Sequence, residues 1–152
     1  MPTFWFTDDE VAKLVRYFEA MSKQPFVYQA PKVAALSAPE KKLAEAIWSP
    51  KGMNCLQCHL AEGKETPDAE TKAPHLGYAK TRLKPEWMAR WIPKPVDMQP
   101  WTAMTSNFVR ETPDDPHSRW VYMTQLPEFS GVSADHVDLM IRWVYGLPDA
   151  PK

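Results

Sequence analysis

Several features that would indicate common classes of protein are absent from this sequence. It contains no run of about 18 or more apolar residues, so no segment is predicted to span a membrane. Its 18 Lys and Arg against 19 Asp and Glu give a net charge of -1, which argues against nucleic acid and against a basic membrane-binding surface. The amino terminus becomes polar at Thr7, and no signal peptide is predicted there. What remains is a chain long enough to bury one core.

Cysteine is also scarce, and its two positions are informative. Cys55 and Cys58 are the only cysteines, and His59 follows directly. Cys-x-x-Cys-His is the attachment site of c-type haem. The two thiols add across the vinyl groups of the porphyrin, a helical turn sets their separation, and the histidine reaches the iron as proximal ligand. The motif predicts one haem c, covalently bound through Cys55 and Cys58, with His59 on the iron.

Two other uses of the same residues are possible. Cys-x-x-Cys can form a redox dithiol or half of a zinc site. A zinc site usually needs a second close pair of ligands, and no further Cys-x-x-Cys or His-x-x-x-His pair occurs. A thioredoxin-like dithiol would follow a strand, and the flanking sequence shows no strand pattern. Haem attachment is therefore the favoured interpretation.

The remaining composition suits a helical protein around a large flat group. Sixteen prolines against five glycines indicate short helices joined by irregular loops. Apolar spacing and capping residues predict helices over residues 7–21, 38–49, 86–92 and 133–146. Seven tryptophans and eight methionines are suited to packing around a porphyrin. We therefore expect an all-α chain with long irregular loops.

Three further motifs follow the haem motif in order. Pro74-His75-Leu76-Gly77 comes first, Arg82-Leu83-Lys84-Pro85-Glu86-Trp87 second, and Pro100-Trp101-Thr102-Ala103-Met104 third. Over residues 36–146 this order resembles that of a class I c-type cytochrome. The resemblance implies a cytochrome c-like fold, here with an extra N-terminal helix. It also implies that the Pro74 carbonyl accepts a hydrogen bond from His59 Nδ1 and that Leu76 packs on the haem.

The sixth ligand of the iron is less directly indicated. Met104 lies in a Pro-x-Thr-x-Met context and is the expected ligand, since a thioether favours ferrous iron and raises the potential. Met98 and Met123 lack this context, and His117 would give two imidazoles instead. The chain departs from the family pattern here, because Thr105 follows Met104 where the family has proline. An extra stretch of roughly two dozen residues then precedes the last helix.

Other residues are candidates for contacts with the haem. Arg82 can pair with a propionate through its bidentate guanidinium, or remain a solvated loop residue. Trp87 and Trp91 lie four residues apart on one helix face, where both can wall the haem and one indole NH can reach the other propionate. Core packing is the alternative for both. His75 is expected to face away from the iron, and His136 to lie on the surface.

The chain is predicted to have two parts. Residues 1–35 form an N-terminal helix and linker, and residues 36–148 form the cytochrome c domain. Met1-Pro2-Thr3-Phe4 precedes the first helix much as Leu126-Pro127-Glu128-Phe129 precedes the last. The first part is therefore either the tail of a preceding cytochrome domain or a simple extension.

These expectations converge on one-electron transfer through a haem with His59 and Met104 as axial ligands. On this interpretation the chain is not itself an enzyme. It is a carrier or the relay domain of a larger oxidoreductase, with redox proteins or neighbouring haem domains as partners, in the periplasm or another extracytoplasmic compartment. The alternative is a haem with an open sixth site, acting as a ligand sensor or peroxidase-like enzyme. A third possibility is that the loop over residues 105–130 docks a partner.

Overall fold

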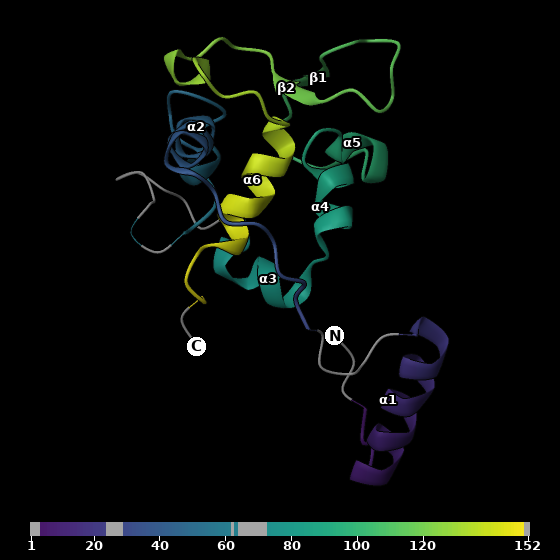
Figure 1. Ribbon diagram of the computed structural model, residues 1–152. Coiled ribbons are helices and arrows are strands. Elements are labelled where there is room, and N and C mark those ends of the chain that lie inside the picture. Colours follow the sequence, from purple (N-terminus) through teal and green to yellow (C-terminus); the bar gives the residue numbers. More distant parts are fainter. Residues whose placement is uncertain (1–3, 24–28, 62, 64–72, 151–152) are drawn as a thin grey trace. The chain divides into compact units, whose positions relative to one another are not determined.

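The computed structural model describes residues 4–23, 29–61, 63 and 73–150, and the chain divides into two compact units (Figure 1). The first unit is Met1–Pro31 and the second is Lys32–Lys152. The division falls close to residue 35, where the sequence analysis placed the domain boundary.

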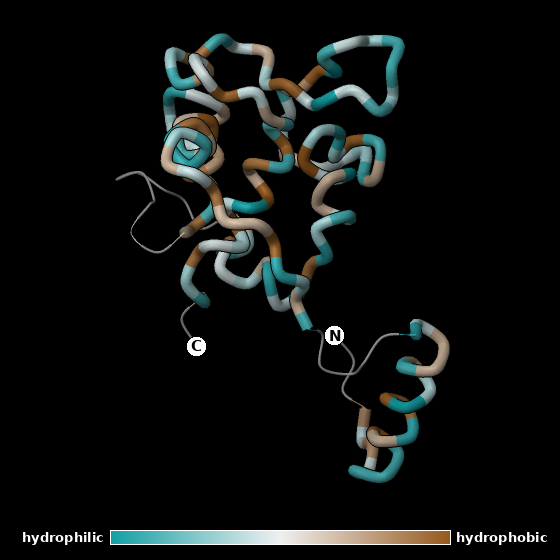
Figure 2. Tube along the Cα trace, viewed as in Figure 1, coloured by the Kyte–Doolittle hydropathy of each residue, from teal (hydrophilic) through white to brown (hydrophobic). Residues whose placement is uncertain are grey.

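The first unit contains one helix, α1, which spans Asp8–Ser22. The predicted capping box is present, because Glu10 Oε2 accepts from the Thr7 backbone NH at 2.8 Å while the Glu10 NH donates to Thr7 Oγ1 at 3.4 Å. No residue of α1 is buried, and Figure 2 shows hydrophobic and hydrophilic positions alternating along it. Residues 1–3, part of the repeat noted in the sequence, lie outside the described residues.

The second unit is organised around its last helix. Helix α6, His136–Tyr145, lies between α2, Ala38–Trp48, and α4, Pro85–Trp91 (Figure 1). The indoles of Trp48 and Trp143 stack across the α2–α6 contact, with ring centroids 5.3 Å apart. The fully buried large side chains of this core are Leu43, Ile47, Pro95, Val137, Leu139, Met140 and Val144.

An ion pair links the start of α2 to α6. Glu40 Oε2 accepts from the Ser37 backbone NH at 2.8 Å, and Glu40 Oε1 lies 2.6 Å from a guanidinium nitrogen of Arg142. These hydrogen bonds, with the Ser37 contacts contributing most, lower the pKa of Glu40 to about 2. The helix ends at Trp48, within two residues of its predicted end and shortly before the cysteine motif.

Helix α4 agrees with its sequence prediction within one residue at each end. Pro85 opens α4 at its first turn, as expected from its missing NH. The remaining helical segments are η1 (Cys55–Gln57), η2 (Leu76–Tyr78), α3 (Ala79–Arg82), α5 (Pro95–Met98) and η3 (Pro127–Phe129).

The expectation of an all-α chain is wrong. Strands β1, Phe108–Arg110, and β2, Trp120–Tyr122, form an antiparallel pair in which Val109 faces Val121. The described residues therefore form a mainly helical structure with a small two-stranded sheet. Three-residue strands are shorter than the alternating runs by which strands are recognised in a sequence, so periodicity gave no signal here.

The outer edge of β2 is covered by the beginning of α6. The Trp120 NH donates to Asp135 Oδ2 at 2.8 Å, and the Tyr122 NH donates to His136 Nδ1 at 2.9 Å. Asp135 Oδ1 also accepts from the Asp138 NH at 3.0 Å, so Asp135 is the N-cap of α6. The strand edge is thus satisfied by side chains instead of being left open to another chain.

Two predictions near this edge are corrected by the same contacts. The sequence analysis placed the start of the last helix at Ser133, but the cap is Asp135, two residues later. His136 was expected at the surface, yet its side chain is buried and contacts the ring of Phe129, with centroids 4.6 Å apart. Burial lowers the pKa of His136, which favours the neutral imidazole that accepts from Tyr122.

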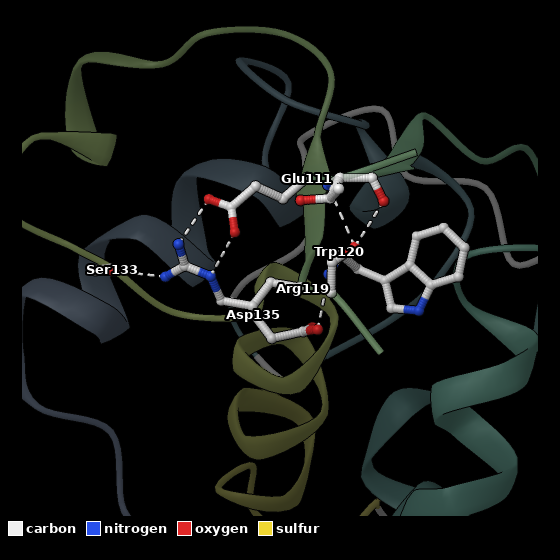
Figure 3. A network of polar contacts seen from close by, with 7 residues as sticks. Glu111, Arg119, Trp120, Ser133 and Asp135 are labelled. Carbon is white, nitrogen blue, oxygen red and sulfur yellow. Dashed lines mark hydrogen bonds and ion pairs between the residues drawn. The ribbon is translucent and has the colours of Figure 1, made fainter. Parts of the chain in front are cut away.

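A polar network holds the hairpin loop beside this edge (Figure 3). The Arg119 guanidinium binds both carboxylate oxygens of Glu111, at 3.0 and 2.6 Å, and also donates to Ser133 Oγ. This bidentate pair joins the two ends of the hairpin loop. The loop between β1 and β2 is therefore held by side-chain contacts at both of its ends.

Candidate functional site

A tight turn carries the chain from α2 into the cysteine motif. A Cβ on Gly52 would lie 2.6 Å from the Ile47 Cα and 2.7 Å from the Ala46 carbonyl oxygen, so only glycine fits this close approach. Asn54 then adopts a left-handed conformation, with φ of 54°, which asparagine tolerates better than most residues. This turn sets the direction in which the motif leaves the helix.

The motif itself forms the helical turn that was predicted for it. The Cys58 NH donates to the Cys55 carbonyl at 3.1 Å, and the His59 NH donates to the same carbonyl at 2.9 Å. Cys55 and His59 are half-buried, whereas Cys58 is exposed. The turn therefore presents the two sulfurs and the imidazole from a single short segment.

His59 is oriented by the segment that follows the motif. Its Nδ1 lies 2.8 Å from the Pro74 carbonyl oxygen, which is the hydrogen bond expected from the resemblance. The Leu76 NH donates to the Leu60 carbonyl at 2.8 Å, which fixes this segment against the motif. With Nδ1–H donating to Pro74, the imidazole presents Nε2 as its metal-binding nitrogen. Leu76 is buried in the core beside it.

Burial changes the pKa of two residues of the motif. Burial lowers the pKa of His59, although the bond to Pro74 opposes the shift, so the neutral imidazole is favoured, which is the form that binds a metal. Burial raises the pKa of the Cys55 thiol to about 12.

A second group of predicted residues gathers on α4 and the segment after α5. The indoles of Trp87 and Trp91 stack with centroids 5.2 Å apart and an interplanar angle of 15°. Trp91 Nε1 donates to Met104 Sδ at 2.8 Å. Met104 is half-buried, and its NH donates to Thr102 Oγ1 at 3.2 Å. The structure thus brings Trp87, Trp91 and Met104 together.

The two groups border one core. Cys55, Trp87 and Met104 all pack against the hydrophobic cluster formed by α2, α4 and α6. The Trp91–Met104 bond was not foreseen, because its partners are separated by a loop that gives no periodic signal. The sequence analysis expected that an indole NH of Trp87 or Trp91 can reach a propionate, and in the structure the indole NH of Trp91 donates to the Met104 sulfur.

The remaining candidates have other surroundings. Arg82 is exposed and stacks over the Tyr78 ring, with the guanidinium carbon 4.2 Å from the ring centroid. His75 Nδ1 accepts from the Gly77 NH at 3.0 Å, which accounts for its position. Among the alternative sixth ligands, Met123 is 60% exposed, His117 is exposed and Met98 is half-buried.

Two open cavities of about 550 and 430 Å³ lie elsewhere in the second unit. The first is lined by α4, α6 and the hairpin, and the second by the hairpin and residues 125–136. Neither is lined by the cysteine motif or by Met104. Within the described ranges no cluster of three or more His, Cys, Asp or Glu side chains that suits a bare metal ion occurs. None of the helices described combines the length and apolar character needed to cross a bilayer.

Comparison of the chain with protein-family models, curated proteins and solved structures finds no match. The case for a function therefore depends on the site itself. Its donors are an imidazole with Nδ1 already engaged, two thiols on one turn and a half-buried thioether. This set fits haem c, whose attachment uses two thiols and whose iron takes imidazole and thioether ligands.

Proposed function

We propose that the second unit binds one haem c covalently and acts as an electron-transfer module related to class I c-type cytochromes. The hydrogen bond from His59 Nδ1 to the Pro74 carbonyl is the observation that carries the proposal. It joins the pentapeptide motif to a residue 15 positions away and orients the imidazole as a metal ligand requires.

The haem supplies reversible one-electron chemistry, and the chain supplies attachment, orientation and exclusion of water. Cys55 and Cys58 hold the porphyrin through thioether bonds, and His59 is the proximal ligand. Met104 is the proposed distal ligand, because it is half-buried, packs against the core and lies in the group with Trp87 and Trp91. With both axial positions filled by protein, the site is closed to small ligands and is suited to electron transfer.

The partners and compartment follow from the same chemistry. Haem attachment to such motifs takes place outside the cytoplasm, so we place the protein in the periplasm or an equivalent compartment. Its partners are redox proteins or neighbouring haem domains that approach the haem edge near Cys58, the exposed cysteine.

Expression in a host that performs covalent haem attachment tests the proposal. The denatured chain should retain haem, with a mass larger than the polypeptide by one haem, and a variant with both Cys55→Ala and Cys58→Ala should retain none. A denatured wild-type chain with the mass of the bare polypeptide would overturn the proposal.

The sixth ligand requires a separate comparison. Met104→Ala should abolish the thioether-to-iron charge-transfer band, lower the reduction potential and allow carbon monoxide to bind the reduced form. Met123→Ala is the matched control, since it removes an exposed methionine of the same loop region. Rapid binding of carbon monoxide by the wild-type chain would favour the open-site alternative instead.

A further inference from the structure

The indole of Trp91 has an unusual partner for a half-buried tryptophan. Its Nε1–H donates to the thioether sulfur of Met104 at 2.8 Å, whereas a methionine sulfur is a weak acceptor that most indoles contact only through the ring. A hydrogen bond from an indole NH to this sulfur is therefore a specific arrangement. The need of the indole NH for an acceptor does not by itself explain it.

The indole is also held firmly in place. Trp91 stacks on Trp87 one turn earlier in α4, and α4 packs against the buried helix α6. Pro93, two residues after Trp91, accepts from Ser106 Oγ at 2.6 Å, which ties the segment carrying Met104 to the end of α4. The donor and the acceptor thus belong to two segments that are fixed to each other independently of their own bond.

We propose that Trp91 is a positioning residue for Met104, holding its sulfur by the Nε1–H···Sδ bond and tuning it as the axial ligand of the iron. This inference rests on the proposed function. A thioether sulfur carries two lone pairs, so one can be directed to the iron while the other accepts from the indole. The bond draws electron density from sulfur and weakens its donation to iron, which favours the ferrous state and raises the reduction potential.

The chain offers a matched pair of variants. Trp91→Phe keeps an aromatic ring on α4 but removes the donor, and Trp120→Phe makes the same change at an indole of the hairpin, which packs against the Arg110 guanidinium and lies outside the group around Met104. We expect the Trp91→Phe chain, loaded with haem, to show a lower reduction potential and a shifted thioether-to-iron band. The Trp120→Phe chain should retain both values of the wild type. Equal shifts in the two variants, or none in Trp91→Phe, would overturn the inference.

A measurement on the unsubstituted chain tests the inference even if the variants do not fold. In the reduced, haem-loaded protein the indole NH of Trp91 should exchange with solvent more slowly than that of Trp87, as followed by nuclear magnetic resonance. Equal exchange rates would contradict a held N–H···S bond.

Failure of the inference and failure of the proposed function give different results. If the wild-type chain carries haem but Trp91→Phe has no selective effect, the proposed role of Trp91 is wrong and the proposed haem module still stands. Absence of attached haem removes both, and the mass of the denatured chain reports it before any variant is compared.

Discussion

Helices α1 and α6 have similar sequences and opposite environments. Aligning Thr7 with Ser133 matches Asp9 with Asp135, Val11 with Val137 and Arg16 with Arg142. Eight residues of α6 are buried, whereas none of α1 is. Both helices have an acidic first turn and a side-chain cap. An amphipathic pattern and a cap therefore specify a helix without specifying what covers its apolar face.

Arg142 of α6, which aligns with Arg16 of α1, shows what tertiary structure supplies to the buried helix. Arg142 lies 2.6 Å from Glu40 of α2 and 2.9 Å from Asp138 of its own helix, and its side chain is only 13% exposed. The ion pair with Glu40 joins α6 to α2. The difference between the helices lies in the partners that tertiary structure supplies, and substitutions at matched positions should reveal it.

The largest difference is expected for core truncation. Met140 is fully buried in α6, and the aligned residue of α1 is Leu14, which is 39% exposed. Met140→Ala should lower the free energy of unfolding by about 2–5 kcal/mol, because it leaves a cavity in the core. Leu14→Ala should change it by less than about 0.5 kcal/mol, as measured by urea unfolding.

This comparison depends on the exposure of the α1 face in the folded protein. A loss of more than about 2 kcal/mol in Leu14→Ala would mean that this face is covered in solution. The two helices would then differ far less than the structure indicates.

A smaller difference is expected at the helix caps. Asp135→Ala removes the cap of α6 and leaves the Trp120 NH without its acceptor, so we expect a loss of about 2 kcal/mol. Thr7→Ala removes a cap that has no tertiary contact in α1. It should reduce the local helicity of α1, seen in carbon chemical shifts, without changing the unfolding midpoint of the second unit.

Asp135→Asn is the control for this pair, because its single amide oxygen can replace only one of the two carboxylate oxygens that accept from the Trp120 and Asp138 NH groups. It should recover only part of the stability lost in Asp135→Ala. If Asn is as stable as the wild type, one of these two hydrogen bonds contributes nothing, and the description of the strand edge is wrong.

Local sequence signals predicted much of this fold. Capping residues, prolines in first turns and apolar spacing predicted helices over residues 7–21, 38–49 and 86–92, whose ends agree within about two residues with those of α1, α2 and α4. The hairpin was missed because its strands are short and its edge depends on Asp135 and His136, which are distant in sequence. The burial of His136 was missed for the same reason.

Prediction of the candidate site from the sequence was limited in a similar way. The motif turn and the bond from His59 to Pro74 were predicted, because covalent spacing and a short downstream element determine them. The partners of Arg82 and Trp91 were not, because each depends on how separate segments pack. The haem and its axial ligands stay predictions that the experiments on Met104 and on the cysteines address.

The smallest expected difference concerns two capping-box glutamates. Glu10 and Glu40 both accept from the backbone NH of the capping residue, and these hydrogen bonds lower the pKa of each. Glu40 alone has the Arg142 guanidinium as a further partner. Since its pKa falls to about 2 in the folded chain, Glu40 contributes stability that is present above the ordinary glutamate pKa of 4.5 and is lost as the pH falls toward 2.

Glu40→Gln should therefore unfold more easily than the wild type at pH 7, by about 1 kcal/mol, and this deficit should shrink as the pH falls from about 4.5 toward 2. Glu10→Gln is the matched control, and it should leave unfolding of the second unit unchanged at every pH. Urea unfolding at a series of pH values measures both. A deficit of Glu40→Gln that stays constant with pH would show that the charge of Glu40 contributes nothing, either through its hydrogen bonds to Ser37 or through the ion pair with Arg142, and the link between α2 and α6 would then depend on shape alone.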